Sequence, residues 1–322
     1  MPESPRYLEA INRALADELQ RDEGVVLLGV DVGVAGGAYG ATRGLHERFP
    51  ERVIDTPIAE AGVLGAAVGA AMTGLRPVAE IMYMDFITVC LDPIVNQAAK
   101  LRYMTGGAAT VPIVFRTQTG GGRSGGAQHS QSLEGILAHV PGLRVFCPAD
   151  ARDAYDLLVA AIRDDSPVCF VENRRLYNRR DPEWERASLP PGRARVIRRG
   201  RDLTVVAWGR MVSETLRALD EADDLDAELI DLRTLAPLDL EVVFASVAKT
   251  GRCLIVHEAV EAFGPGAEIA ARIADGVLWE LDGPVARFGA QPSPVPYSPA
   301  LEAHMLPTHS SIAAKLREVA AA

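Results

Sequence analysis

The segment RYLEAINRALADELQ, residues 6–20, followed by VVLLG, residues 25–29, decides the fold. The first stretch carries apolar side chains at helical spacing, and the second is a short continuous apolar run of the kind found in buried strands. The same alternation continues with helical and strand-like segments over 59–72, 78–82, 91–103 and 111–115. Strands that alternate with helices predict a parallel sheet covered by helices on both faces.

A stretch rich in proline and charge interrupts this alternation between Asn178 and Gly200, and we interpret it as a linker. After it the alternation of strands and helices resumes over 203–209, 213–222, 227–233, 239–249, 253–259 and 266–275. We therefore expect an α/β protein with two three-layer, parallel-sheet domains. The predicted boundaries are 1–180 for the first domain, 181–200 for the linker and 201–322 for the second domain.

The composition narrows the class of protein. A chain of 322 residues exceeds the usual size of a single core, which agrees with two domains. Its formal charge of -10 argues against a nucleic-acid or anionic-membrane surface, because a polyanion would be repelled. No apolar run approaches the roughly 20 residues of a membrane helix. The polar N-terminus matches no secretory signal, and the four cysteines form no C-x-x-C pair, so we expect buried thiols in a cytoplasmic protein.

The segment TQTGGGRSGG, residues 117–126, is too rich in glycine for the interior of a helix or strand and predicts a mobile or sharply turned loop. Gly122, Ser124 and Gly126 satisfy the G-x-S-x-G pattern of the α/β-hydrolase nucleophile elbow. That elbow needs a strand directly before it and a helix directly after it, whereas polar residues follow here. A hydrolase that uses Ser124 stays open as an alternative.

Glu60 is a candidate functional carboxyl. Thr56 and Pro57 resemble an N-cap and first-turn pair, which places Glu60 in the opening turn of a helix. One interpretation is a carboxylate stabilised by the helix dipole. The other is a carboxyl desolvated by its apolar neighbours, which would favour the protonated, hydrogen-bond-donating form. The residues alone leave both open.

His129 lies in GAQHSQS, directly after the glycine-rich loop. It could be an ordinary surface imidazole. The loop could equally place this titratable ring at the mouth of a cleft, as acid–base catalysis requires. No His, Cys, Asp or Glu residues show the spacing of a zinc site.

Several strings in this order resemble the β subunits of pyruvate, acetoin and branched-chain 2-oxo acid dehydrogenases. They are DTPIAEAG (55–62), VGAAMTGLRPVAEIM (68–82), PIVFR (112–116), AQHSQS (127–132), HVPGL (139–143), LRTLAPLD (232–239), VHEA (256–259) and PYSP (296–299). The resemblance covers essentially the whole chain. It implies a pyrimidine-binding domain of a thiamine-diphosphate enzyme, followed by a domain of the transketolase C-terminal type.

The resemblance also implies the site residues. Glu60 matches the glutamate of the family's TPI-x-E motif, which donates a hydrogen bond to the aminopyrimidine ring of thiamine diphosphate. Ile58, Met82 and Phe86 match positions that pack against that ring, and all three are apolar, as a ring-binding wall requires. His129 matches the histidine of the QHSQ motif, which would protonate or orient intermediates and help pass the acyl group to a lipoyl arm.

Thiamine enzymes that bind the diphosphate on one chain carry a G-D-G motif and a downstream asparagine that hold magnesium, and this sequence contains no G-D-G. The resemblance therefore implies that the diphosphate and its magnesium ion lie on a partner α subunit, in an α₂β₂ assembly. A lipoyl-bearing acyltransferase core is the expected downstream partner. A single-chain transketolase-like enzyme would need the missing motif on this chain.

Two further features follow from the resemblance. The family's β subunits often hold a potassium ion, and the matching residues here are Ile113, Ala161, Ile162 and Asp164. Relatives usually read G-E-D-V or G-E-E-V where this chain reads GVDV, so Val30 replaces an acidic residue of a proposed proton relay between paired active sites. Valine cannot carry a proton, so this relay is expected to be interrupted.

The expected function is that of the β subunit of a heterotetrameric 2-oxo acid dehydrogenase. It would take part in the oxidative decarboxylation of a small 2-oxo acid, with acyl transfer to a lipoyl group. An acetoin dehydrogenase β subunit and a non-catalytic assembly paralogue of the family are the alternatives.

Overall fold

The computed structural model describes residues 4–180, 184 and 186–322. The chain forms two compact units. The first consists of Met1–Thr119 and Ile136–Pro191, and the second of Gly120–Gly135 and Gly192–Ala322. Residues 120–126 of the glycine-rich segment therefore belong to the second unit, although in sequence they interrupt the first, and residues 117–119, expected in the loop, belong to the first unit as the end of strand β4 (Val114–Thr119).

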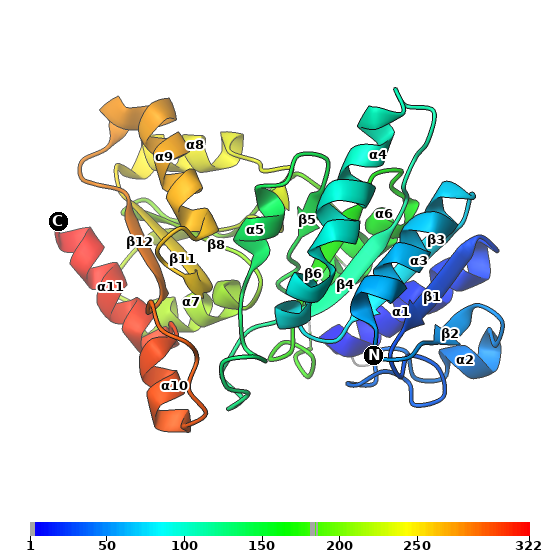
Figure 1. Ribbon diagram of the computed structural model, residues 1–322. Helices are drawn as coiled ribbons and strands as arrows, with labels where there is room; N and C mark the ends of the chain where they lie inside the picture. The colour runs from blue at the N-terminus through cyan, green and yellow to red at the C-terminus, as the bar shows by residue number, and fades with distance from the viewer. Residues whose placement is uncertain (1–3, 181–183, 185) are drawn as a thin grey trace. The chain divides into compact units, whose positions relative to one another are not determined.

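A parallel sheet forms the centre of the first unit (Figure 1). Its strand order is β5-β6-β4-β3-β1-β2, and every neighbouring pair runs parallel. The strands are β1 (Val25–Gly29), β2 (Val53–Asp55), β3 (Arg76–Ile81), β4 (Val114–Thr119), β5 (Arg144–Phe146) and β6 (Val168–Asn173). The Val25 and Leu27 side chains of β1 are fully buried, and each contributes about 1.5–3 kcal/mol to folding.

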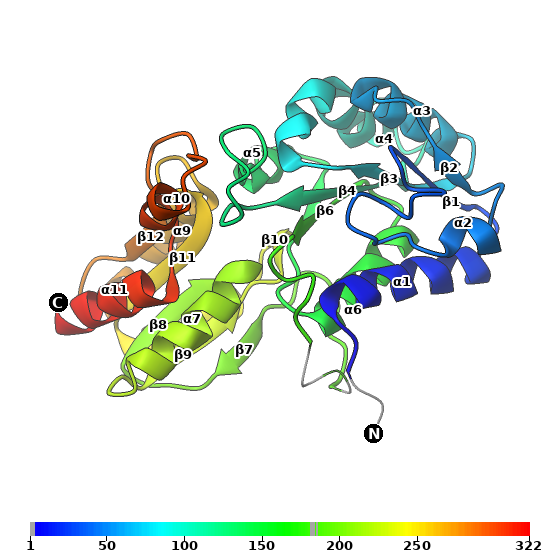
Figure 2. The same ribbon diagram turned by 90° about the horizontal axis from the view of Figure 1, so that it is seen from below.

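Helices cover both faces of this sheet, as Figure 2 shows. On one face lie α1 (Tyr7–Arg21) and α6 (Ala151–Arg163), which pack against each other. On the other face lie α3 (Glu60–Met72), the π-helix η2 (Pro93–Ala98) and α4 (Ala99–Met104). The 3-10 helix η1 (Met84–Cys90) follows β3, and the short helix α2 (Leu45–Arg48) precedes β2.

A fully buried ionic cluster crosses the middle of the first sheet. Arg116 on β4 donates to Glu80 on β3 at 2.8 Å and to Glu172 on β6 at 2.7 Å. Tyr177 donates its hydroxyl to the same Glu172 at 2.7 Å. Burial disfavours the charge of Arg116, but Glu172 and Glu80 together keep its pKa above the ordinary value. A buried cation between two carboxylates needs both partners, so the cluster ties three strands together.

The second unit is built around a mostly parallel sheet with the order β12-β11-β8-β9-β7. Only the β7–β9 pair of this order runs antiparallel. The strands are β7 (Arg195–Arg198), β8 (Leu203–Ala207), β9 (Ala227–Asp231), β11 (Cys253–Val260) and β12 (Ala286–Ala290), and a short strand β10 (Thr234–Ala236) follows β9 in sequence.

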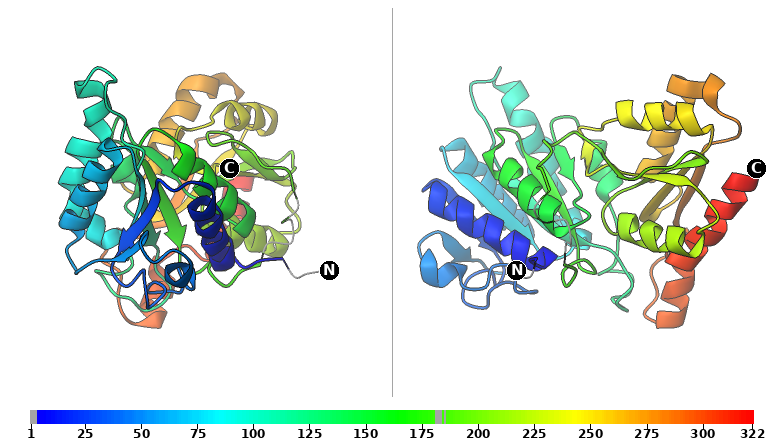
Figure 3. Two further views of the ribbon diagram at one scale, coloured as in Figure 1. Left: turned by 90° about the vertical axis from the view of Figure 1, so that its right-hand side faces the viewer. Right: turned by 180° about the vertical axis from the view of Figure 1, so that it is seen from behind.

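Helices again cover both faces of this second sheet (Figures 1 and 3). One layer holds α7 (Arg210–Glu221) and α11 (His309–Ala321), which pack against each other. The other holds α8 (Glu241–Thr250) and α9 (Pro265–Val277). The remaining elements are η3 (Leu278–Glu280), α10 (Pro299–Met305) and α5 (Glu134–Ala138), within which the chain passes back from the second unit to the first.

The predicted fold class is confirmed, and most predicted helices and strands lie within a few residues of their expected places. Strand β4 differs: it runs to Thr119, past the expected end at residue 115, because polar Thr117 and Thr119 stay buried and paired with β6. The domain boundaries stay a prediction. However, residues 195–198, expected in the linker, form strand β7. Residues 181–183 and 185 of that linker lie outside the described residues.

All four cysteines are buried, as expected from the apolar runs that contain them. Among the helices that the structure describes, none is long and apolar enough to cross a membrane.

Candidate active site

The carboxyl of Glu60 lies at the N-terminal end of α3. The N-cap of this helix is Ala59, so Glu60 is its first residue. The expected cap at Thr56 and Pro57 is wrong, because the helix begins only at Glu60 and the Thr56 N–H still donates to the Gly29 carbonyl of β1 at 3.0 Å. The partial positive charge of the helix N-terminus stabilises a carboxylate at this position.

The apolar residues next to Glu60 in sequence face outward in this chain. Ile58 is 79% exposed, Ala61 and Gly62 are also exposed, and Glu60 itself is half-buried. Ile58, Ala61 and Gly62 therefore leave Glu60 partly open to solvent in this chain, since the helix buries its other face. The Glu60 carboxyl lies on an exposed, partly apolar surface that another molecule can cover.

Met82 and Phe86 lie where the chain leaves β3. Met82 directly follows the strand and Phe86 stands in η1, and both side chains are half-buried. The rings of Phe86 and Tyr83 meet edge to face with their centroids 5.6 Å apart. Burial and, after it, the charge of Glu60 raise the pKa of the Cys90 thiol, at the end of η1, to about 12. Glu60 is therefore an electrostatic neighbour of η1.

These four predicted residues share one edge of the first sheet. Ile58 and Glu60 follow the carboxyl end of β2, and Met82 and Phe86 follow the carboxyl end of β3. In open α/β sheets, ligands bind at the carboxyl ends of the strands. The fold therefore brings these residues to the edge at which such a sheet presents a ligand site.

Asp55, at the end of β2, is a structural part of this edge that the sequence reasoning missed. Its carboxylate accepts the N–H groups of Gly33 at 2.6 Å and Val34 at 3.3 Å, and so holds the loop after β1. A Cβ atom on Gly33 would lie 2.5 Å from an Asp55 oxygen, so a larger residue there would push the Asp55 carboxylate away. The aspartate of the DTPIAEAG string was the available signal. Val30, half-buried, begins the loop that Asp55 holds.

The loop before His129, in the second unit, is sharply turned. Gly120, Gly122 and Gly126 have φ angles of 95°, 84° and 72°, which favour glycine, and Ser124 has a φ of 55°. Strand β4 ends at Thr119 and the next helix, α5, begins only at residue 134. Ser124 therefore does not stand on a strand–turn–helix elbow, and the hydrolase alternative is wrong.

His129 is half-buried and follows directly from this loop. Its backbone N–H donates to the Gly126 carbonyl at 3.4 Å. A Cβ atom on Gly125 would lie 2.9 Å from the Ser130 hydroxyl and 3.1 Å from the His129 carbonyl, so the loop folds closely onto these two residues. His129 belongs to the second unit and Glu60 to the first.

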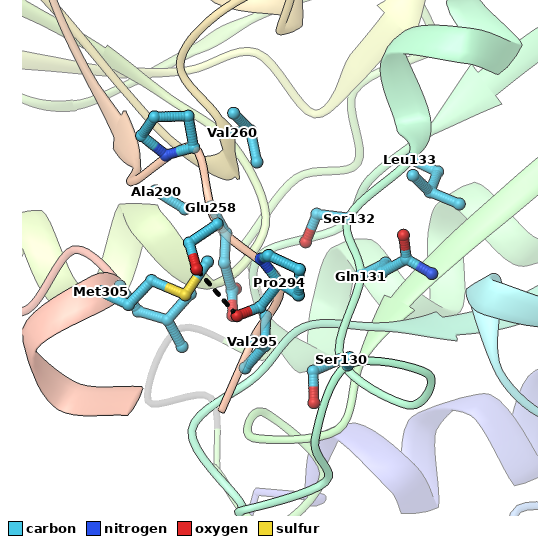
Figure 4. A pocket seen from close by; sticks show the side chains of 14 residues that line it. Ser130, Gln131, Ser132, Leu133, Glu258, Val260, Ala290, Pro294, Val295 and Met305 are labelled. Atoms are coloured by element: carbon cyan, nitrogen blue, oxygen red, sulfur yellow. Dashed lines mark hydrogen bonds between the residues drawn. The ribbon is translucent and has the colours of Figure 1, made fainter. Parts of the chain in front are cut away.

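A pocket of about 360 Å³ lies within the second unit beside the residues that follow His129. Figure 4 shows Ser130, Gln131 and Ser132 along one side of it, and Glu258 and Met305 on the other. The lining combines a few polar groups with apolar ones from four separate segments, namely Ala127, Ser130, Gln131, Ser132, Leu133, Glu258, Val260, Ala290, Pro292, Ser293, Pro294, Val295, Met305 and Leu306.

Three buried side chains, Glu134, Trp208 and His257, contact one another in the second unit, just beyond the segment that contains His129. Trp208 donates its indole N–H to Glu134 at 3.2 Å, and the indole stacks on the His257 ring at 5.4 Å. Burial raises the pKa of Glu134 and lowers that of His257 to about 4. His257 is thus a neutral core side chain, and the sequence signals for it and for Glu134 were the strings VHEA and SQSLEG.

The four residues matched to a potassium site all lie in the first unit. The carbonyl oxygens of Ile162 and Asp164 both accept hydrogen bonds from one guanidinium nitrogen of Arg76, at 3.1 Å each. The carbonyls of Ile113 and Ala161 accept backbone N–H groups. The carbonyl oxygens of Ile162 and Asp164, two of the four predicted potassium ligands, therefore point at the same position, and the guanidinium of Arg76 occupies that position. Within the described part of the chain, no group of three or more His, Cys, Asp or Glu side chains could hold a metal ion.

Solved structures share this fold. A split-gene transketolase, described as an inactive β4 tetramer, matches with a TM-score of 0.82 at 23% identity, covering 99% of each chain. The transketolase of Leishmania mexicana matches with a TM-score of 0.74 at 15% identity, covering all of this chain and 46% of that one. At these identities the likeness shows the fold alone.

Sequence comparison shows the family. Residues 3–180 match the pyrimidine-binding domain of transketolase, and residues 192–312 match its C-terminal domain. The pyruvate dehydrogenase E1 component subunit β of Bacillus subtilis is 42% identical over 97% of both chains. The 2-oxoisovalerate dehydrogenase subunit β of the same organism is 41% identical over 98% of both. The acetoin:2,6-dichlorophenolindophenol oxidoreductase subunit β of Cupriavidus necator is 42% identical, covering 96% of this chain and 95% of that one.

The site and the comparisons agree on one class of protein. Glu60, in its TPIAE string, stands at the carboxyl-end edge of a domain that matches a pyrimidine-binding domain along its length. The chain belongs to the β subunits of the thiamine-diphosphate-dependent 2-oxo acid dehydrogenase family, built from the pyrimidine-binding and C-terminal domains of transketolase.

Proposed function

We propose that this chain is the β half of an α₂β₂ enzyme that oxidatively decarboxylates a small 2-oxo acid and passes the acyl group to a lipoyl arm. The observation that carries the proposal is the full-length similarity, above 40%, to β subunits named for pyruvate and 2-oxoisovalerate, together with Glu60 at the start of α3. The similar identity to both relatives leaves the side chain of the substrate open.

The residues around Glu60 fit a pyrimidine ring. An exposed apolar side chain, Ile58, and the half-buried Met82 and Phe86 offer apolar surface at the same sheet edge as a half-buried carboxyl. A planar heterocycle needs such a wall together with one directed polar group. Thiamine diphosphate, when bound, supplies an electron sink for cleavage of the carbon–carbon bond.

Glu60 would hold a proton toward a ring nitrogen of the aminopyrimidine. In the single chain its carboxyl is half-buried, so water competes for that hydrogen bond. Cover from a partner subunit over Ile58 and Ala61 would exclude this water and favour the protonated, donating form. The open apolar surface beside Glu60 thus supports an active site that is completed only by the α subunit.

His129 would supply the second functional group of this chain. Its loop is tightly turned, so the backbone before the ring is defined by hydrogen bonds rather than free to move. An imidazole can take up a proton near neutral pH and the imidazolium can release it again, which suits the protonation or orientation of the acyl group during its transfer.

The diphosphate and magnesium are proposed to lie on the α subunit, and a lipoyl-bearing acyltransferase core is the proposed acyl acceptor. We also propose a cation position at the carbonyls of Ile162 and Asp164. The guanidinium of Arg76 occupies it in this chain, and a potassium ion would compete with that side chain. Val30 stands where the family resemblance places an acidic residue, so the proposed proton relay between the two active sites of the tetramer would lack that residue.

The proposal is tested by purifying the chain with its α partner and assaying 2-oxo acid decarboxylation with thiamine diphosphate. Glu60→Gln should lower kcat by about 10²- to 10⁴-fold, the usual contribution of a positioned acid or base. Glu47→Gln is the matched control, because Glu47 is an exposed carboxylate in the first turn of α2. Activity that survives Glu60→Gln unchanged would refute the mechanism and favour a non-catalytic assembly subunit.

Acetoin cleavage is a second candidate, favoured by the 42% identity to the Cupriavidus necator subunit named for acetoin. The same purified complex distinguishes the two. Reduction of 2,6-dichlorophenolindophenol with acetoin, and not with pyruvate or branched-chain 2-oxo acids, would assign the acetoin reaction.

A further inference from the structure

The glycine-rich loop before His129 is held by a buried carboxylate far away in sequence. Glu302, on α10, is 3% exposed. One of its oxygens accepts the Gly122 N–H at 2.7 Å, and the other accepts the Ser124 N–H at 2.8 Å. Both bonds are charge-assisted, which makes them shorter and stronger than bonds between neutral groups.

A second carboxylate holds the start of the same loop. Glu258, on β11, accepts the Gly121 N–H at 2.9 Å and the Arg210 guanidinium at 3.1 Å. Arg210 offsets the charge of Glu258. Three backbone N–H groups within four residues therefore point at carboxylates, and the loop has the character of an anion-binding nest filled by the protein's own side chains.

Close packing shows that the loop and the segment around α10 fit together. A Cβ atom on Gly121 would lie 2.7 Å from the Leu306 side chain and 3.2 Å from a Glu302 oxygen. A Cβ atom on Gly126 would overlap the Tyr297 ring. Tyr297, Glu302 and Leu306 thus form a cradle around the loop, and glycine is favoured at 126, where the φ angle is also positive.

The loop ends three residues before His129, and the His129 N–H donates back to the Gly126 carbonyl. A change in the path of residues 121–126 would therefore move the imidazole. We propose that Glu302 is a positioning residue for His129, which it places by holding the Gly122 and Ser124 N–H groups. The consequence for catalysis rests on the role of His129 in the proposed function.

Three variants separate this role from a general effect on folding. Glu302→Gln keeps the shape, but it removes the charge and turns an NH₂ donor toward one of the two N–H groups. Glu302→Asp keeps both acceptor oxygens on a side chain one methylene shorter. His304→Gln is the matched control, since His304 is exposed on the same short helix.

The first readout is amide hydrogen exchange of the α₂β₂ complex, followed in peptides that cover residues 117–133. Loss of one charged hydrogen bond and the conflict at the other should speed exchange of the Gly122 and Ser124 amides by about 10-fold or more in Glu302→Gln. Glu302→Asp should lie between this variant and the wild type, and His304→Gln should match the wild type.

The second readout compares two activities of the same complexes. Dye-coupled decarboxylation reports the steps up to loss of carbon dioxide, and acylation of a lipoyl domain reports the transfer step. Glu302→Gln should lower lipoyl acylation more than dye reduction, in the same ratio as His129→Ala. The double variant should be no slower than His129→Ala, because the two changes remove one function.

Unchanged loop exchange in Glu302→Gln would overturn the proposal. Faster exchange with both activities intact would overturn it as well, provided that His129→Ala lowers lipoyl acylation. Additive losses in the double variant would overturn it as well, because they would show that the two residues act separately. If His129→Ala leaves both activities unchanged, the proposed role of His129 fails, while the exchange measurement still decides whether Glu302 holds the loop.

Discussion

Acid should destabilise the second unit through His257. The side chain is fully buried, and its Nδ1 lies 3.1 Å from the Ala259 carbonyl. Because a carbonyl oxygen only accepts, Nδ1 carries the proton of the neutral ring. Burial, helped by the charge of Arg287 and opposed by the bond to Ala259, lowers the pKa of His257 from 6.5 to about 4.

The sign and size of the effect follow from this shift. Between pH 6.5 and about 4, the unfolded chain binds a proton at His257 that the folded chain does not. The stability is therefore full above pH 6.5 and is lost as the pH falls toward 4. Each tenfold change in proton affinity is worth about 1.4 kcal/mol, so the total loss is about 3 kcal/mol.

Urea unfolding between pH 4 and 7 measures this loss. Trp208 stacks on the His257 ring at an interplanar angle of 14°, so its fluorescence reports locally once Trp184 and Trp279 are replaced by phenylalanine. His257→Gln should remove the part of the pH dependence that comes from this proton, whereas exposed His304→Gln should not. Equal pH dependence in wild type and His257→Gln would refute the reasoning.

Two further changes test the first unit. Arg116→Gln leaves Glu80 and Glu172 buried without their cation, which should cost about 3–5 kcal/mol of stability, and a melting temperature equal to that of the wild type would contradict this account of the cluster. Arg76→Met frees two converging carbonyl groups, so its melting temperature should rise when potassium replaces sodium, and by more than in the wild type. No response of the variant to potassium would rule out the proposed cation position.

Local patterns in the sequence were sufficient for much of the fold and for one half of the site. VVLLG is apolar along its length because helices cover both faces of its sheet, so its buried-strand character can be read without a structure. Glu60 could likewise be placed in the first turn of a helix, although its cap lies three residues later than the Thr56 signal indicated. Such features depend on neighbours in sequence.

Features that depend on distant residues had no comparable signal. Arg76 meets the Ile162 carbonyl across 86 positions, and Glu302 meets Gly122 across 180. Neither contact leaves a periodic pattern, because hydrogen bonds between separate elements have no fixed spacing. The exposure of Ile58 was missed for a related reason: composition shows that the α3 region is apolar, but only packing decides which face is covered.

The opening alternation of helix and strand thus determined the α/β class, because the 3.6-residue period of a helix and the continuous apolar run of a doubly covered strand can both be read over a few neighbouring residues. The family motifs identified Glu60 and His129 as candidate site residues. Tertiary structure alone decided that VVLLG ends in a loop held by Asp55, that Glu60 stands on an open surface, and that the loop before His129 rests on Glu302. These features depend on how separate segments pack, because packing brings into contact residues that are far apart in the sequence.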